Sequence, residues 1–469
     1  MNGLVFIIAS VNLVLRIKQV RFRDLGLFSV ILALICLFWM WFIEDYVGWG
    51  FALLAMVCSV LVLGALFFFS FLPWLLFDKI RNKLGFGVFF AFYFAFWQYI
   101  FYSMDDLGLS FVQFFFTQSG TFALYPIFFS PFWVNVIMAL IVMFMAFGLN
   151  CWRSRVIFSL FFVIINLLMF WVYEKEANRC LYELIGRLKE NRLFIFAIST
   201  DVIASPPDYR IRNEEQTFQK IKEALKVANQ IYDSYFLFLL PEGSISKDQA
   251  SIFDLNNPSY SPCISKIRKA LSEIYQKKEL NLAILSRSWI FFNPSSVDYI
   301  NKVVYNSVLS VKLEQVWNGG INDYQIYHKV FLVPFIEFTP GFFMSVAKFL
   351  SKWIIVFSYI DYSPGVDKSK NFICNNVSFR PMICFESFKN LYNITSFDQV
   401  DFIVVSSNDS WFKGNLMYNL HRKSVRMLSI AKKLPVIFVV NGNPSCLFMF
   451  FDFTDVFRGF DLSGRIVIL

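Results

Sequence analysis

The most reactive side chains of this sequence stand where short apolar runs end. Glu242 follows the run at residues 235–240, and Cys384 closes the run at 381–384. In folds that alternate strands with helices, sites gather at the ends of strands, so a carboxylate and a thiol in these places predict one convergent pocket. Polar residues also follow two further runs: Ser406, Ser407, Asn408, Asp409 and Ser410 after 402–405, and Asn441, Gly442 and Asn443 after 436–440.

Cys384 is the strongest candidate nucleophile among the eight cysteines, because it ends a predicted strand and Glu386 follows two residues later. A thiol becomes reactive when a cation or a base lowers its pKa, and Lys329, directly before the predicted strand 330–335, is a candidate cation. Taken alone, a cysteine is more often a small buried apolar residue, and a lysine that flanks a strand is common. With two histidines and no C-x-x-C pair, neither a metal nor a cofactor is expected.

Taken together, the motifs resemble the nitrilase superfamily. Its order of motifs is matched by Pro241-Glu242, the segment 329–337 (Lys-x-x-Leu-Val-Pro-Phe-x-Glu), the segment 383–386 (Ile-Cys-Phe-Glu) and the segment 408–412 (Asn-Asp-Ser-Trp-Phe). The form Tyr-x-Lys-x-x-Leu-Val-Pro-Phe, placed after several long apolar runs, is similar to that of the bacterial apolipoprotein N-acyltransferases. Ser363, Pro364, Gly365, His421, Arg426, Met427 and Pro435 also fit that family.

The resemblance implies a nitrilase-like αββα sandwich with a catalytic triad of Glu242, Lys329 and Cys384. It implies supporting roles for Glu337, Phe385 and Glu386; Phe385 stands where the family commonly has tyrosine. The implied reaction moves an acyl chain from a membrane phospholipid to the cysteine as a thioester. The chain then passes to the α-amino group of the diacylglyceryl-cysteine that begins a lipoprotein. We therefore expect a phospholipid donor, a lipoprotein acceptor and a monomeric enzyme in the bacterial inner membrane, with its catalytic domain facing the periplasm.

Long apolar runs fill residues 1–173, and short charged joints separate them. A helix needs about 20 apolar residues to cross a bilayer. Runs of this kind stand at 25–43, within 47–77, and at 84–101, 131–149 and 156–173, and a shorter run stands at 4–15. The chain is 57% hydrophobic and 16% charged, whereas soluble domains carry about 25% charged residues. Residues 1–173 are therefore expected to form a polytopic α-helical membrane domain of about five or six spans.

The joints between these runs alternate in charge. Basic residues stand at 16–23, 79–83 and 153–155, and acidic residues stand at 44–45 and 105–106. Cytoplasmic loops carry the excess of lysine and arginine, so the last run is expected to lead outward. The net charge of +9 then reflects topology, and nucleic acid is not an expected partner. Residues 174–190 are expected to be a connector, and residues 191–469 the catalytic domain on the outer face.

After residue 190, short apolar runs alternate with amphipathic helical patterns, as in an α/β fold whose sheets are buried on both faces. The predicted strands are 193–198, 235–240, 280–285, 330–335, 381–384, 402–405 and 436–440, and the predicted helices are 214–232, 265–275, 342–357 and 420–433. Helix 342–357 carries Phe342, Phe343 and Trp353. It is either a core helix or a flap that dips into the membrane interface and guards acyl entry, and we favour the flap.

Two other functions are compatible with these motifs. A membrane-tethered nitrilase-like amidase would use the same three residues but release its product to water. An inactive membrane scaffold or a transporter would not need Cys384 at all. Acidic residues are almost absent from the predicted spans, which argues against a transporter because ion pathways usually use them.

Overall fold

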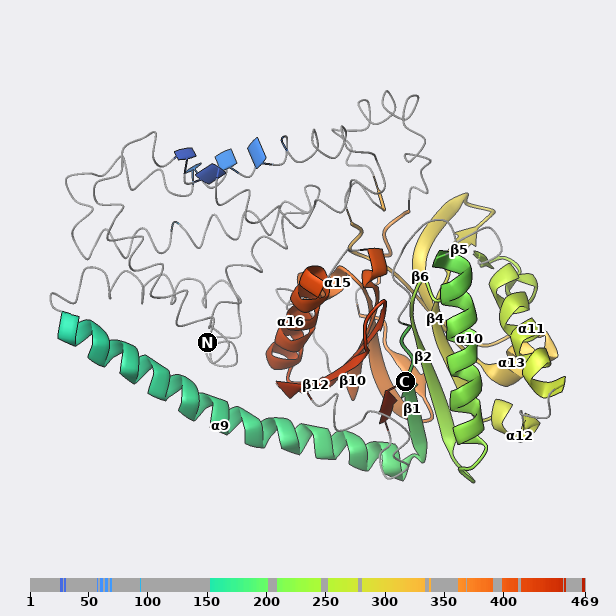
Figure 1. Ribbon diagram of the computed structural model, residues 1–469. Helices are drawn as coiled ribbons and strands as arrows, with labels where there is room; N and C mark the ends of the chain where they lie inside the picture. The colour runs from blue at the N-terminus through green and yellow to red at the C-terminus, as the bar shows by residue number, and fades with distance from the viewer. Residues whose placement is uncertain are drawn as a thin grey trace. The chain divides into compact units, whose positions relative to one another are not determined.

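Figure 1 shows the computed structural model of the chain. It describes residues 152–200, 209–245, 252–276, 281–333, 337–338, 362–367, 369–390, 399–411, 415–449, 451–452 and 466–468, with separate positions between 26 and 93. Two compact units are present, one of residues 1–173 with 340–358 and one of residues 174–339 with 359–469. The predicted spans before residue 150 and the predicted flap lie outside the described residues, apart from those separate positions. Within the described part of the chain, no helix is both long and apolar enough to cross a bilayer.

Helix α9 (Trp152–Glu190) has 39 residues, and its C-terminal part is the segment expected to be a connector. Leu181, Leu184 and Leu188 are buried in a core of the second unit. Their spacing of three and four residues places them on one face of the helix. Arg187 on the same helix forms an ion pair with Asp401. The end of α9 is therefore anchored to the second unit by packing and by charge.

Two sheets form the second unit. The larger has the order β14-β1-β2-β4-β6-β5-β3, with β7 also paired to β6, and the smaller has the order β13-β12-β11-β10-β9-β8. The strands of the larger sheet are β1 (Leu193–Ala197), β2 (Tyr235–Glu242), β3 (Ile252–Asp254), β4 (Ser288–Asn293), β5 (Ser295–Asp298), β6 (Val303–Lys312), β7 (Tyr324–His328) and β14 (Ile466–Ile468). Those of the smaller sheet are β8 (Phe372–Cys374), β9 (Val377–Ile383), β10 (Phe402–Asn408), β11 (Val436–Asn441), β12 (Cys446–Met449) and β13 (Phe451–Asp452). Strands β1, β2 and β4 run parallel, as do β9, β10 and β11, so the carboxyl ends within each set share an edge.

The larger sheet is buried on both faces, and strand β2 shows this residue by residue. Phe236, Phe238 and Leu240 lie in one hydrophobic core, whereas Leu237 and Leu239 lie in the other. Successive side chains of a strand point to opposite faces. A strand covered on both sides must therefore be apolar at every position, which is why it reads as a continuous run.

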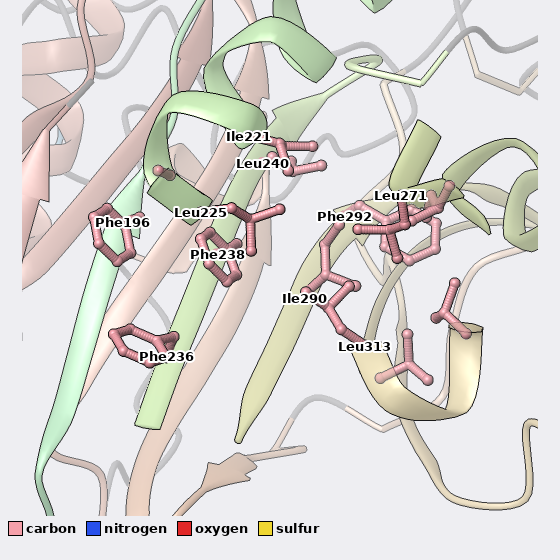
Figure 2. Close-up of a cluster of buried hydrophobic side chains, with 14 of the residues drawn as sticks. Phe196, Ile221, Leu225, Phe236, Phe238, Leu240, Leu271, Ile290, Phe292 and Leu313 are labelled. Carbon is pink, nitrogen blue, oxygen red and sulfur yellow. The ribbon is translucent and has the colours of Figure 1, made fainter. Parts of the chain in front are cut away.

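Helices cover the outer face of each sheet. On the larger sheet, Ile221 and Leu225 of α10 (Tyr209–Ala228) lie over β2, and Leu271 of α11 (Pro262–Gln276) packs near Phe292 of β4 (Figure 2). On the smaller sheet, α16 (Asn415–Lys432) packs against β11 and β12 and contacts α15 (Glu386–Asn390). The resulting layers are helix, sheet, sheet and helix (Figure 1), so the expected αββα arrangement is confirmed for the described part of the second unit.

The predicted strand at 280–285 is wrong. Residues Leu282–Leu285 form the short helix α12, and the strand comes later, as β4. The side chain of Asn281 accepts a hydrogen bond of 3.0 Å from the backbone N–H of Ala283, which caps the helix. A short apolar run has no periodicity that separates strand from helix, so the cap decided the conformation.

The predicted strand at 330–335 is also wrong over its described residues, 330–333. The strand, β7, ends before Lys329 and does not follow it. Backbone N–H groups of Val330 and Val333 donate to the carboxylates of Glu386 and Glu337, at 2.7 and 2.8 Å. These side-chain acceptors replace a neighbouring strand, so the apolar residues form a loop at the site.

Candidate active site

Cys384 occupies a tight turn between strand β9 and helix α15. Its backbone φ is +48°, a left-handed value that non-glycine residues adopt rarely. The turn is held by hydrogen bonds from the Cys384 N–H to the carbonyl of Ser406, at 2.8 Å, and from the Ser387 N–H to the carbonyl of Cys384, at 3.1 Å. This turn places Cys384, a residue of intermediate burial, at the carboxyl edge of the smaller sheet.

Lys329 and Glu337 form a buried ion pair. The Nζ of Lys329 lies 2.9 Å from Oε1 and 2.8 Å from Oε2 of Glu337. The Nδ2 of Asn306 donates to Oε1 of Glu242 at 3.1 Å and to Oε1 of Glu337 at 2.5 Å. One amide therefore joins the two carboxylates, and through Glu337 it joins the lysine.

The charges of this cluster act on one another. Burial by itself lowers the pKa of Lys329, but Glu337, Cys384 and Glu242 together outweigh burial, so the pKa of Lys329 lies above its ordinary value. Burial, and after it the charge of Glu242, raise the pKa of the Cys384 thiol, the charge of Lys329 lowers it, and the net result is a pKa of about 12. At neutral pH the lysine is a cation and the thiol is protonated. The nucleophile therefore needs a base to take its proton, and Glu242 is the nearby carboxylate.

Glu386 joins the turn at Cys384 (the thiol turn) to the loop that follows Lys329 (the lysine loop). Its buried carboxylate accepts hydrogen bonds from the N–H of Ile383 at 2.8 Å, the hydroxyl of Tyr327 at 2.6 Å and the N–H of Val330 at 2.7 Å. Burial raises the pKa of Glu386, although these hydrogen bonds oppose the shift. Phe385 is buried with its ring 6.1 Å from that of Phe388. Glu386 thus orients two segments of the site, and Phe385 packs beside α15.

The second sheet supports the end of β2. Gly243 has a φ of +72°, and a Cβ there would meet Nδ2 of Asn408 at 2.9 Å, so this position needs glycine. The Nδ2 of Asn441 donates to the carbonyl of Glu242 at 2.5 Å. The polar residues predicted at the ends of β10 and β11 therefore meet the end of β2, where they hold the backbone of Glu242.

The structure brings Glu242, Lys329, Glu337 and Cys384 into one cluster, with Glu386 beside it. Asn306 is not among the residues predicted from the sequence, although it is buried and its hydrogen bonds place it at the centre of the cluster. Asparagine is unfavourable inside strands, so an asparagine within the run 303–312 was an available signal. Phe342, Phe343 and Trp353 lie outside the described residues. Among the residues described, no group of three or more histidine, cysteine, aspartate or glutamate side chains could hold a metal ion.

The raised pKa of Cys384 predicts how its alkylation depends on pH. In the protein without substrate, we expect the rate of Cys384 carbamidomethylation by iodoacetamide to rise about tenfold per pH unit from neutral pH upward, because the thiolate fraction does so below the pKa. Peptide mass spectrometry measures this rate, and the buried Cys374 serves as an internal reference. A rate that levels off below pH 8 would contradict a pKa of about 12.

Solved structures that align with the chain are members of the nitrilase, or CN-hydrolase, superfamily. One from Saccharomyces cerevisiae aligns with a TM-score of 0.33 and 15% identity, over 53% of this chain and 79% of that chain. Another, from Xanthomonas campestris, aligns with a TM-score of 0.33 and 13% identity, over 55% of this chain and 83% of that chain. No protein-family model matches the chain.

The curated relatives that match the chain by sequence point to one activity, because each of them is named apolipoprotein N-acyltransferase. That of Aquifex aeolicus is 32% identical over 165 residues, which is 35% of this chain and 34% of the relative. That of Vibrio parahaemolyticus is 29% identical over 141 residues, which is 29% of this chain and 27% of the relative. The chain thus spans about a third of the length of the curated relatives it matches. The resemblance that the motifs indicated is confirmed.

Proposed function

We propose that this chain is an N-acyltransferase that moves a fatty acyl chain from a phospholipid, through a thioester on Cys384, to the N-terminal diacylglyceryl-cysteine of a lipoprotein. The observation that supports it most is the cluster in which Asn306 joins Glu242 to the Lys329–Glu337 pair, with Cys384 close enough to interact with both charges. The names of the curated relatives favour the same reaction.

The first step forms the acyl-enzyme. Glu242 takes the thiol proton, and the sulfur of Cys384 attacks the ester carbonyl carbon of the phospholipid. The ammonium of Lys329 stabilises the oxygen that becomes negative, a contribution of about 2.7–4 kcal/mol for one such donor. The tetrahedral intermediate then breaks its C–O bond. The proton on Glu242 passes to the departing alcohol, which leaves as a lysophospholipid.

The second step transfers the acyl chain to nitrogen. The incoming α-amino group reacts as the neutral amine, and Glu242 takes one proton from it as the nitrogen attacks the thioester carbonyl. The C–N bond forms, the C–S bond breaks, and Glu242 returns the proton to the sulfur. Glu337 keeps the Lys329 ammonium in place throughout. A thioester suits this step because an amine attacks it more readily than it attacks an oxygen ester.

Both substrates are anchored in lipid, so the proposal includes the bacterial inner membrane. The apolar runs of residues 1–173 would form the multi-pass anchor, and the alternation of basic and acidic joints favours a catalytic unit that faces the periplasm. Phe342, Phe343 and Trp353 would belong to a flap that admits the acyl chain. These parts of the proposal rest on the sequence and on the family resemblance.

The direct test is to look for the acyl-enzyme. The full chain, purified with lipid, is incubated with bacterial phospholipids that carry deuterated acyl chains, and its peptides are analysed by mass spectrometry. We expect a deuterated acyl group on Cys384, released by neutral hydroxylamine, and unmodified Cys374. A synthetic diacylated lipopeptide should then remove the acyl group and become triacylated. Absence of the adduct contradicts the proposal, and release of the acyl group to water alone would favour the amidase.

A further inference from the structure

A second buried polar pair lies next to the thiol turn and takes no part in the chemistry above. Asp409 follows β10, and His421 is on α16; both side chains are almost fully buried. The Nδ1 of His421 lies 3.0 Å from Oδ1 of Asp409. That oxygen also accepts a hydrogen bond of 2.7 Å from the hydroxyl of Ser407. Burying a carboxylate and an imidazole costs desolvation free energy. We therefore expect this pair to have a role in the site.

The imidazole reaches directly to the nucleophile's backbone. The Nε2 of His421 lies 3.2 Å from the carbonyl oxygen of Cys384 and 2.9 Å from Oγ of Ser387. An ionised carboxylate can only accept, so Nδ1 carries the proton that Asp409 receives. The Nε2 atom lies within hydrogen-bond distance of the Ser387 hydroxyl and of the Cys384 carbonyl, so the ring is bonded to the turn.

Aromatic packing fixes the ring between the strand and the turn. Its centroid lies 5.1 Å from that of Phe388 in a stacked arrangement and 4.8 Å from that of Phe438 on β11. The two aromatic rings therefore flank the imidazole and support its position beside the turn. One end of the imidazole is held by the smaller sheet through Asp409, and the other end holds the turn.

The turn needs such a support because the backbone of Cys384 has a left-handed conformation. Cys384 has a φ of +48°, which surrounding structure must impose on a residue with a Cβ. Glu386 holds the entry to the turn through the N–H of Ile383, and its contacts lie on the side of the lysine loop. The carbonyl of Cys384 itself lies within reach of the Ser387 N–H and of His421. Releasing that carbonyl would let the peptide rotate and turn the thiol away from Glu242.

We propose that Asp409 and His421 are positioning residues for the acyl transfer: they hold the turn at Cys384 through its carbonyl and the Ser387 hydroxyl, and thereby aim the thiol at Glu242 and Lys329. The proposal rests on Cys384 being the nucleophile of the proposed function. Neither residue contacts a reacting atom. The pair acts on the geometry of the nucleophile and not on substrate binding.

The test compares three variants of the full chain in lipid. His421→Phe keeps an aromatic ring between Phe388 and Phe438 but removes both hydrogen bonds, and we expect its kcat to fall about 10- to 100-fold, because a displacement of one ångström can cost that much. The KM for phospholipid should stay unchanged within error. His421→Gln places an amide near the position of Nε2 and should recover part of the lost kcat. Asp409→Asn should lose activity in the same way as His421→Phe.

Controls separate positioning from folding. Ser429→Ala removes a hydroxyl on the same helix that bonds to the carbonyl of Leu434, far from the turn, and should leave kcat unchanged. The proposal is overturned if His421→Phe retains the kcat of the natural chain, or if the loss appears as a rise in KM. It is also overturned if His421→Gln is no better than His421→Phe. Where His421→Phe fails to fold, Asp409→Asn and His421→Gln decide by the same kcat and KM criteria.

A lipid-free measurement distinguishes this proposal from the proposed function. The rate at which iodoacetamide alkylates Cys384 needs no acyl donor, and we expect it to change several-fold in His421→Phe and to return toward the natural rate in His421→Gln. If the natural chain forms no acyl adduct, the proposed function fails, and the alkylation rates still test the positioning role. Equal alkylation rates in all variants would refute the positioning role while leaving the proposed function standing.

Discussion

The Cys384→Ala variant is expected to keep its fold and lose acyl transfer by at least about a thousandfold, the scale seen when an enzyme loses its nucleophile. The reason is that no other group in the cluster can form the thioester. The substitution removes a single heavy atom, the sulfur, so it leaves only a small cavity, and the melting temperature should change little. The yield of triacylated lipopeptide from a diacylated one, with phospholipid as donor, measures the loss.

Cys384→Ser is the matched variant, because it keeps a hydroxyl in the same turn. A serine hydroxyl ionises far less readily than a thiol, and an acyl-serine ester resists attack by an amine. We expect slow acylation and an ester that accumulates without passing to the lipopeptide. A Cys384→Ala chain that still restores lipoprotein acylation in a strain lacking the enzyme would instead support the inactive scaffold.

Replacing Lys329 with methionine is expected to damage both stability and activity. The ammonium sits between the two carboxylate oxygens of Glu337 and is fully buried. Its loss leaves a buried carboxylate without its cation, which typically costs about 3–5 kcal/mol of unfolding free energy. The proposed oxyanion donor is lost as well, and this should lower the rate of acyl-enzyme formation about 10²- to 10³-fold. Denaturant unfolding and single-turnover acylation measure the two effects.

The double variant Lys329→Met with Glu337→Gln separates the loss of stability from the loss of activity. It replaces the ion pair by two neutral side chains of similar size, so most of the lost stability should return. Activity should not return, because the donor is still absent. A double variant as unstable as Lys329→Met alone would contradict the assignment of the stability loss to the unpaired Glu337.

The stability that the Lys329–Glu337 ion pair contributes depends on pH. The pKa of Lys329 is raised above its ordinary value of 10.5, so the folded state holds this proton more tightly than the unfolded chain does. The resulting stability is fully present below pH 10.5 and is lost only as the pH rises through the folded value. In the proposed reaction, Lys329 is therefore charged at neutral pH.

The sequence alone was sufficient to place Glu242 and Cys384. Each stands at the end of an apolar run, and a run that is buried on both faces needs apolar side chains at every position, so its end is visible in the sequence. The carboxyl ends of parallel strands share an edge only within one sheet; β2 and β9 belong to different sheets, so the packing of the two sheets brings these two ends together. The helices α10, α11 and α16 were predictable for a similar reason, because their periodicity is a property of neighbouring residues.

Only the tertiary structure decided how Lys329 and Asn306 take part. Lys329 follows a strand that ends at His328, and the apolar residues after it form a loop because carboxylates, not another strand, bind their N–H groups. Asn306 lies inside β6 and reaches Glu242 because β6 is antiparallel to β4, which lies beside β2. No local pattern contains that order of strands.

The contacts of Asp409 and His421 were likewise not predictable from a local sequence pattern. Both stood in motifs that the sequence displayed, but their bond to each other and to the carbonyl of Cys384 joins a strand end, a helix and a turn. Residue types and spacing thus determined which groups could do chemistry and at which edge. The packing of two sheets and their helices decided which polar side chains meet, because contacts between distant segments depend on the whole arrangement of buried faces.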